Sequence, residues 1–221
     1  MKSSSKAQST GGEPDLLTFE RTARAAGFKL VAGVDEAGRG PLAGPVVAAA
    51  VILPEGFDPV GVVDSKRLSP RARERLFGGI VANCLAFGIS SASARVIDRI
   101  GIVPATMLAM RRAVMKLEPR PDFVLVDGTR TPDGLGIPSE AIIRGDGRSR
   151  SIAAASILAK VTRDRLMRNL DRWYPAYGFA SHKGYGTRSH RLRLEADGPT
   201  PHHRLSFSPL RQLKLSLNGD R

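Results

Sequence analysis

The sequence predicts a mixed α/β protein in which helices flank a β-sheet. Its 221 residues, 42% of them hydrophobic, suffice for one domain with a sizeable core. Short apolar runs of β-favouring residues come first, and longer stretches with helical spacing are intermixed later. No internal repeat divides the chain. We therefore expect residues 1–14 to form a disordered tail and residues 15–221 one domain, with a helical, aromatic and basic C-terminal region from about residue 171.

The first half of the chain is expected to begin with a short helix over residues 15–26, which ends at Gly27. Apolar, β-branched runs then predict strands, the second of which is closed by Pro54. Ser69-Pro70 predicts a helix start, because serine is a favoured N-cap and proline suits the first turn. The expected elements are strands 29–34, 46–53 and 86–94, and a helix from residue 69 to about 86.

The second half is expected to place helices around further short strands. A helix begins at Pro104 and ends at Pro119, and apolar residues at helical spacing give it a core face: Met107, Met110, Val114 and Leu117. Residues 123–126 predict a strand that ends at Asp127-Gly128, and residues 141–144 predict another. A long helix over residues 151–170 presents alanines for close approach to a sheet, and an outward face of Arg165, Arg168 and Arg172.

Composition excludes several classes of protein. No segment has the roughly 18 uninterrupted apolar residues of a membrane span, and the first 14 residues lack the apolar centre of a secretory signal. A single cysteine, Cys84, rules out an internal disulfide and a cysteine-rich zinc site, and it is interpreted as packing rather than as a nucleophile. We expect a cytoplasmic protein and find nothing that suggests more than a monomer.

Positive charge is concentrated in one region of the chain. Residues 148–193 hold eleven Lys or Arg and two acids, a net +9 of the total +13. A run of charge is ordinarily a solvated face. This region also contains five of the twelve aromatic residues: Trp173, Tyr174, Tyr177, Phe179 and Tyr185. The mixture of basic and aromatic residues favours nucleic acid as the partner.

Two acids followed by a glycine turn form the most informative segment. Asp35 and Glu36 end the first predicted strand, and Gly38-Arg39-Gly40 follows at once. A dinucleotide-binding turn is disfavoured, because the G-x-G-x-x-G spacing is absent and two carboxylates repel a phosphate. A divalent cation between the acids would reverse that repulsion.

Two further acids follow predicted strands, and strand ends that neighbour in a sheet would bring Asp127 and Asp146 towards Asp35 and Glu36. Clustered carboxylates raise one another's pKa unless a hard cation such as Mg²⁺ or Mn²⁺ takes their oxygens as ligands. Adjacent strand residues point to opposite faces, so we expect the strand to end or bulge at the first two acids.

Plain alternatives exist for each acid. Asp127-Gly128 and Asp146-Gly147 are also common turn pairs. Asp164 is assigned to a helix-surface ion pair, because it lies four residues from Lys160 and from Arg168. The four histidines show no metal-ligand spacing, which favours oxygen ligation.

Five motifs, in order, resemble those of type HII ribonucleases H. They are Asp35 to Gly40, Asp64-Ser65-Lys66, Val126-Asp127-Gly128, Ala154 to Asp164, and His182 to Thr187. The resemblance covers about residues 29 to 207. It implies an RNase H-like catalytic domain, a mixed sheet flanked by helices with a helical C-terminal extension. It also implies that Asp35, Glu36, Asp127 and Asp146 are the catalytic, metal-binding acids.

The activity implied by this resemblance is cleavage of the RNA strand of RNA/DNA hybrids. Cutting 5′ of single ribonucleotides in duplex DNA is also implied, with 5′-phosphate and 3′-hydroxyl ends produced by two cations about 4 Å apart. Gly38, Arg39, Gly40 and Tyr185 would recognise the ribonucleotide, and Lys66 and the basic region would hold phosphates. Two rival hypotheses are a noncatalytic basic nucleic-acid-binding module and another nuclease of the same fold. A weaker expectation is that the terminal residues Gln212 to Leu217 bind a sliding clamp, with a packed helix end as the alternative.

Overall fold

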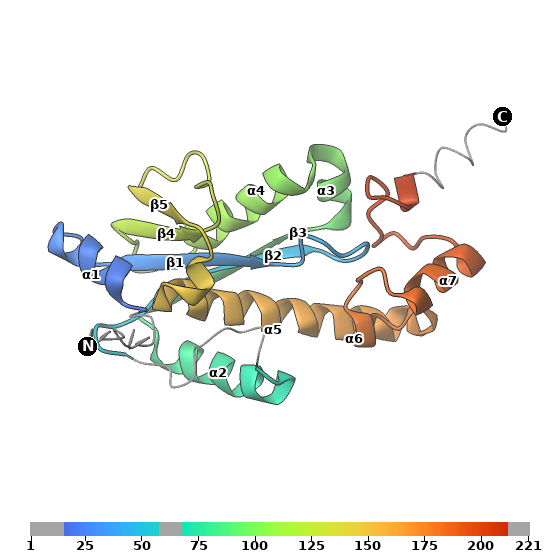
Figure 1. Ribbon diagram of the computed structural model, residues 1–221, viewed down its shortest axis with the longest axis horizontal. Helices are drawn as coiled ribbons and strands as arrows, with labels where there is room; N and C mark the ends of the chain where they lie inside the picture. Colours follow the sequence, from blue (N-terminus) through green and yellow to red (C-terminus); the bar gives the residue numbers. More distant parts are fainter. Residues whose placement is uncertain (1–15, 58–67, 212–221) are drawn as a thin grey trace, which may run out of the picture.

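A five-stranded mixed sheet forms the centre of the molecule (Figure 1). The computed structural model describes residues 16–57 and 68–211. The strands are arranged in the order β3-β2-β1-β4-β5; β3, β2 and β1 are antiparallel, and β1, β4 and β5 are parallel. Their bounds are β1 Val31–Ala37, β2 Val46–Ile52, β3 Ala86–Ala92, β4 Phe123–Asp127 and β5 Ser139–Ile142. The predicted mixed α/β sheet is confirmed.

Helices cover both faces of this sheet. In Figure 1, α4 (Ile102–Val114) lies above it and α5 (Arg150–Trp173) below it, with α2 (Pro70–Asn83) outside α5. All seven residues of β2 are buried because both of its faces are covered. A Cβ atom on Gly33 would lie 2.1 Å from the Ser151 backbone, so only glycine lets α5 approach β1 this closely.

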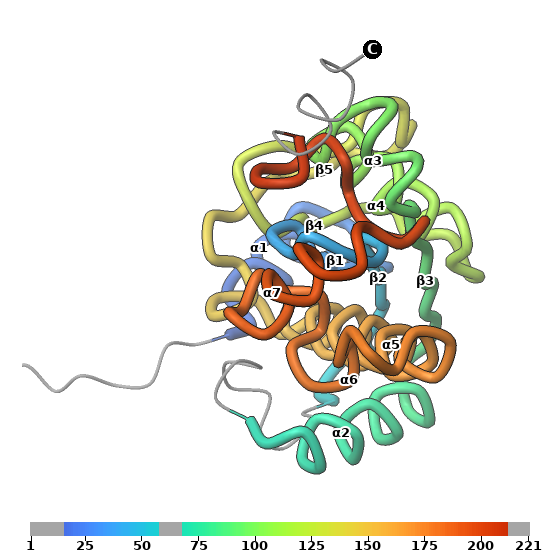
Figure 2. Tube along the Cα trace, turned by 90° about the vertical axis from the view of Figure 1, so that its right-hand side faces the viewer, coloured from blue at the N-terminus to red at the C-terminus, as the bar shows by residue number. Residues whose placement is uncertain are grey.

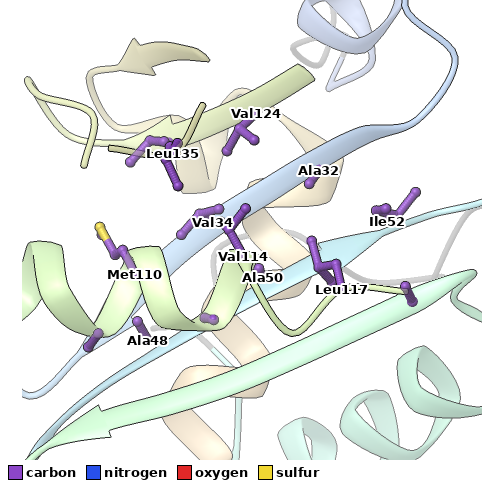
Figure 3. Close-up of a cluster of buried hydrophobic side chains, with 14 residues drawn as sticks. Ala32, Val34, Ala48, Ala50, Ile52, Met110, Val114, Leu117, Val124 and Leu135 are labelled. Carbon is purple, nitrogen blue, oxygen red and sulfur yellow. The ribbon is translucent and has the colours of Figure 1, made fainter. Parts of the chain in front are cut away.

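The predicted core face of α4 is confirmed. Figure 3 shows Met110 and Val114 in one cluster with the sheet residues Val34 and Ala50. Met107 packs partly buried against this cluster, and Leu117 belongs to it but lies beyond the end of α4 at Val114. On the opposite face, a second cluster joins β2 to the alanines of α5. In the described parts of the chain, no helix is long and apolar enough to cross a membrane.

Element bounds differ from the predictions in a few places. The helix α4 begins at Ile102, so Pro104 lies inside its first turn, and a separate helix, α3 (Ala94–Ile100), was not predicted. Gly101, at φ +85°, separates the two helices. The strand β5 ends at Ile142, before the expected Arg144, because Arg144 adopts a left-handed conformation with φ +55°. The helix α1 (Thr18–Ala25) lies within its predicted range.

Beyond β5 the chain is mostly helical. It forms η1 (Gly145–Gly147), α5, η2 (Pro175–Tyr177), α6 (Phe179–His182) and α7 (Arg188–Asp197). After α7 it returns across the β1–β2 connection, where Ala43 pairs with His203 (Figure 2). Tyr177 and Phe179 are buried in this region's own core, so they do not belong to its exposed surface. Trp173 and Tyr185 are the members of the aromatic group that are exposed.

Candidate active site

Three carboxylates converge at one edge of the sheet. Asp35 and Glu36 lie on β1, and Asp127 is the last residue of β4. The parallel β1–β4 pairing ends at Val34 and Val126, so Asp35 and Asp127 occupy the next position on neighbouring strands. One oxygen of each of the three carboxylates lies within 4.8 Å of the others. Oxygen ligands at this spacing fit a divalent cation such as Mg²⁺ or Mn²⁺.

The expectation that β1 ends or bulges at the acids was wrong. The strand continues to Ala37, and both acids remain in regular register with β2. The Asp35 carboxylate accepts a hydrogen bond from the Glu36 N–H at 2.6 Å. Asp35 and Glu36 therefore meet Asp127 without a break in the strand.

Asp146 belongs to the same pocket. It lies in η1, directly after β5, and lines a cavity of about 250 Å³ together with the three clustered acids. The Gly145 N–H donates to Asp127 Oδ1 at 2.6 Å and thereby holds this turn against β4. The structure thus brings all four predicted acids to one cavity, although Asp146 is outside the tightest group.

The pKa values of Asp35 and Glu36 are raised in this pocket. Burial, followed by the charges of Glu36 and Asp127, raises the pKa of Asp35 well above its ordinary value, despite a hydrogen bond from Ser156. Burial also raises the pKa of Glu36, which Arg39 lowers and the charges of Asp127 and Asp146 raise further. The acids repel one another as expected, and a bound cation would relieve the repulsion.

Three residues of α5 face the acids without having been assigned a role there. Ser156, Lys160 and Arg163 line the cavity, and their four- and three-residue spacing places them on one side of the helix. That spacing is the sequence signal that could have identified them. Lys160 forms the predicted ion pair with Asp164 at 2.5 Å, but Asp164 is 8% exposed and is therefore not on the helix surface as expected.

Two buried arginines fix the glycine turn beside the acids. The Arg204 guanidinium donates to the carbonyl oxygens of Gly38 at 2.6 Å, Arg39 at 2.7 Å and Gly44 at 2.9 Å. Arg163 donates to the carbonyls of Ala43 and Pro45. Gly38 has φ +97°, and a Cβ atom there would lie 1.9 Å from Arg163 Nε. Sequence reasoning missed these arginines, because no pattern in the chain distinguishes a buried arginine from an exposed one.

Tyr185 stands opposite this turn. It is 50% exposed, lines the acid cavity, and its ring lies 3.8 Å from the place where a Cβ atom of Gly40 would be. Lys66 lies outside the residues that the structure describes, and so do Gln212 to Leu217. Arg165, Arg168 and Arg172 are exposed as predicted, but the first two pair with Glu74 of α2.

Comparison with known proteins agrees with this geometry. Residues 32–209 match the family model of ribonuclease HII. A ribonuclease HII of Geobacter sulfurreducens is 54% identical over 200 residues, which are 90% of this chain and 92% of that protein. The chain belongs to the ribonuclease HII family. It is therefore a metal-dependent endoribonuclease that hydrolyses phosphodiester bonds, and the noncatalytic binding module is set aside.

Solved structures support the same family and fold. The ribonuclease H2 of Pyrococcus horikoshii OT3 superposes with a TM-score of 0.74 at 26% identity, over 86% of this chain and 99% of that one. The ribonuclease HII of Archaeoglobus fulgidus, solved in complex with PCNA, gives a TM-score of 0.70 at 26% identity, over 81% and 96%. The predicted RNase H-like fold with a helical C-terminal region is thereby confirmed.

Proposed function

We propose that this ribonuclease HII family member cuts the RNA strand of RNA/DNA hybrids and also cuts 5′ of ribonucleotides embedded in duplex DNA. Its products would carry 5′-phosphate and 3′-hydroxyl ends. The observation that carries the proposal is the meeting of the acid cluster, the glycine turn and Tyr185 at one cavity. A pure nucleic-acid binder has no reason to place carboxylates beside a polyanion.

Asp35, Glu36, Asp127 and Asp146 are proposed as the catalytic residues that hold two divalent cations. All four are hard oxygen donors, as Mg²⁺ and Mn²⁺ prefer. The raised pKa values of Asp35 and Glu36, caused by burial and by neighbouring acids, support the proposal because a bound cation would favour their ionised forms. The chemistry supplied by bound cations is activation of a water and neutralisation of charge on the departing 3′ oxygen. Within the chain, Ser156 supports ionised Asp35, and Gly145 N–H orients Asp127.

Recognition of the ribonucleotide is assigned to Gly38, Arg39, Gly40 and Tyr185. The carbonyls of Gly38 and Arg39 accept from Arg204, so we expect the turn to offer mainly its N–H groups to the 2′-hydroxyl. The exposed Tyr185 ring would stack on the neighbouring deoxyribose. This pairing of a backbone contact and a ring would select a ribonucleotide followed by DNA.

Phosphate contacts that carry no sequence information are assigned to Lys66 and the basic region. Within that region Arg172 is exposed, whereas Arg165 and Arg168 share Glu74 and contribute less net charge. We therefore expect Arg172 and Lys66 to contribute more to the salt dependence of binding than Arg165 or Arg168.

The decisive experiment uses a DNA duplex that carries one ribonucleotide, with and without a chelator. We expect a single cut on the 5′ side of the ribonucleotide, loss of the cut with the chelator, and recovery when Mg²⁺ or Mn²⁺ is restored. An all-DNA duplex of the same sequence is the control. Cleavage of that control would favour another nuclease activity of this fold, and cleavage that survives the chelator would contradict the metal-dependent site.

A sliding clamp is proposed as a partner of the terminal residues Gln212 to Leu217. The support is the likeness of this string to clamp-binding peptides, and the fact that the Archaeoglobus fulgidus relative was solved with PCNA. Clamp pull-down with the full chain and with a chain that ends at Arg211 tests the idea. Equal retention of the two would end it.

A further inference from the structure

Two buried histidines lie beneath the turn that carries Tyr185. His190, on α7, is fully buried, and His203 is 2% exposed. Their Nε2 atoms are 2.9 Å apart. The other nitrogen of His190, Nδ1, lies 2.9 Å from the Tyr185 carbonyl oxygen, and Nδ1 of His203 lies 2.9 Å from the Thr200 backbone nitrogen. The four ring nitrogens connect the Thr200 N–H to the Tyr185 carbonyl oxygen through successive contacts.

The chemistry of the two ends fixes the protons in this line. Both the backbone nitrogen and the hydroxyl Oγ1 of Thr200 lie 2.9 Å from His203 Nδ1. A backbone N–H only donates, so Nδ1 accepts from it, the hydroxyl donates to the same nitrogen, and the proton of His203 resides on Nε2. That proton points at His190 Nε2, which must therefore accept. His190 then carries its proton on Nδ1, where it donates to the Tyr185 carbonyl. Each imidazole is neutral and has one tautomer that satisfies every contact.

A charged imidazole would break this arrangement, because a proton on both Nε2 atoms would set two donors against each other. Burial lowers the pKa of His203 to about 4, with a further lowering from His190, and burial also lowers the pKa of His190. Aromatic rings enclose the pair: Phe179 lies 5.6 Å from each imidazole, and His182 stacks on His190 at 4.4 Å. The surroundings therefore favour the same neutral state as the hydrogen bonds do.

The chain segment that contains His203 also holds the glycine turn, which is the second element proposed to recognise the ribonucleotide. The backbone of His203 pairs with Ala43, which closes the loop that begins at the glycine turn. The next residue, Arg204, holds the carbonyls of Gly38 and Arg39. One short stretch of chain thus contacts the turn through Arg204 and the Tyr185 backbone through His203 and His190.

We propose that His190 and His203 are positioning residues that set the Tyr185 backbone relative to the Gly38–Gly40 turn, and so determine how strongly a single ribonucleotide is preferred over a continuous hybrid. This inference rests on the proposed role of Tyr185 in ribonucleotide recognition. Neither imidazole is proposed to touch the substrate. Their effect passes through the carbonyl hydrogen bond, which limits the movement of the tyrosine backbone.

The test compares two substitutions that differ in one hydrogen bond. The amide nitrogen of an asparagine occupies the place of histidine Nδ1, so His190→Asn keeps a donor for Tyr185, whereas His190→Leu removes it. The measured quantity is kcat/KM for a duplex with one ribonucleotide divided by kcat/KM for a continuous hybrid. We expect His190→Leu to lower this ratio about tenfold, the order of one lost neutral hydrogen bond, and His190→Asn to restore most of it. The neighbouring exposed His202→Leu is the matched control and should leave the ratio unchanged.

The His190 variants test the positioning role, and Tyr185→Ala tests the recognition function on which that role depends. An unchanged ratio in His190→Leu, or an equal loss in both His190 variants, would overturn the positioning role. Tyr185→Ala serves as the reference: if it leaves the ratio unchanged, the proposed recognition function fails instead. Thermal melting of each variant is recorded, because a general loss of stability lowers activity on both substrates and leaves their ratio intact.

A measurement on the unaltered protein keeps the inference testable if the variants fail to fold. Long-range ¹⁵N–¹H correlation spectra distinguish the two neutral tautomers of each histidine. We expect His203 with its proton on Nε2 and His190 with its proton on Nδ1 at neutral pH. The reverse assignment, or a doubly protonated ring at either position, would contradict the proposed hydrogen-bond line.

Discussion

The acid pocket and the arginine pair beneath the glycine turn each bury charges of one sign at the same end of the molecule. In the acid pocket, Asp35, Glu36 and Asp127 bring carboxylate oxygens within 4.8 Å of one another. In the arginine pair, Arg163 and Arg204 are 1% and 0% exposed. The two groups differ in what surrounds the charge. The guanidinium groups point at five different backbone carbonyls, whereas the acids face one another.

This difference separates a structural charge from a functional one. Carbonyl dipoles satisfy the arginines inside the fold, so their charge is used to hold a loop. The acids receive hydrogen bonds from Glu36 N–H, Gly145 N–H and Ser156, yet the pKa of Asp35 remains well above its ordinary value. Arg39 pairs with Glu36 at 3.4 Å and lowers its pKa, yet the pKa values of Asp35 and Glu36 stay raised, and a bound cation would relieve the remaining repulsion. We infer that the acid pocket lowers the free energy of unfolding when no metal is bound. The buried arginines beneath the glycine turn have no such cost, because carbonyls satisfy them.

Asp127→Asn should give the largest effect. Asparagine keeps an oxygen for the Gly145 N–H but removes a negative ligand, so the fold should persist while cleavage falls by at least about 10³-fold. Binding of a hybrid in the absence of metal should be unchanged or tighter, because a negative charge near phosphate is lost. Single-turnover cleavage and a binding titration measure the two. Cleavage at the original rate would remove Asp127 from the mechanism.

Arg204→Met should affect stability more than any change in the acid pocket. The carbonyls of Gly38, Arg39 and Gly44 would lose their donors, at a cost of about 2–3 kcal/mol in the free energy of unfolding. For a chain of this size that corresponds to a fall of roughly 5–10 °C in Tm. Arg204→Lys is the matched variant and should recover only part of the loss, because one ammonium lacks the planar fork. A melting curve identical to that of the unaltered protein would show that the carbonyls do not need the guanidinium.

The sequence predicts the acid side of this comparison much better than the basic side. Apolar runs followed by acids, and a glycine turn after the first pair, are visible as a local pattern, so Asp35, Glu36 and Asp127 could be assigned together. The predicted sheet was likewise confirmed, because β2 and β4 are continuous apolar runs that bury both faces. The order β3-β2-β1-β4-β5 was not predicted, since pairing between distant strands leaves no local signal.

The residues that were missed act through tertiary contacts. Arg204 lies at least 160 residues after the residues whose carbonyls it contacts. Nothing near it in the sequence indicates that its partners are loop carbonyls. The same holds for His190 and His203, whose roles depend on a meeting between α7 and a later loop. Tyr177 and Phe179 show the same limit: an aromatic residue among basic residues has the same local pattern whether it packs inside, as these two do, or faces solvent.

Asp35→Asn should have a smaller effect, and one that changes sign with metal. Because the folded-state pKa of Asp35 is raised, the protein loses stability as the pH rises from the ordinary pKa to the raised one. The cost is complete above the raised pKa and absent below the ordinary one. At pH 8 with a chelator, we expect Asp35→Asn to raise Tm by about 2–4 °C, roughly 1 kcal/mol. The gain should shrink towards pH 4. With Mg²⁺ the order should invert, because only the unaltered protein gains from metal binding. If Asp35→Asn has a lower Tm than the unaltered protein at pH 8 without metal, repulsion between the acids does not destabilise the folded protein.

Glu74→Gln should give the smallest effect on stability, because it removes a charge that is partly exposed to solvent. Glu74 receives hydrogen bonds from Arg165 at 2.5 Å and Arg168 at 2.8 Å, which lower its pKa, but all three side chains are at least a third exposed. Water and salt screen such contacts, so we expect the free energy of unfolding to fall by less than about 0.5 kcal/mol. The loss should disappear near 1 M salt, where screening acts within a few ångströms. Because Glu74 would no longer offset the charge of the two arginines, affinity for a hybrid should rise slightly at low salt, which a binding titration at two salt concentrations can detect. A large, salt-independent loss of stability would mean that Arg165 and Arg168 stabilise the fold as strongly as the buried Arg163 and Arg204. Burial would then not explain the difference between these arginines.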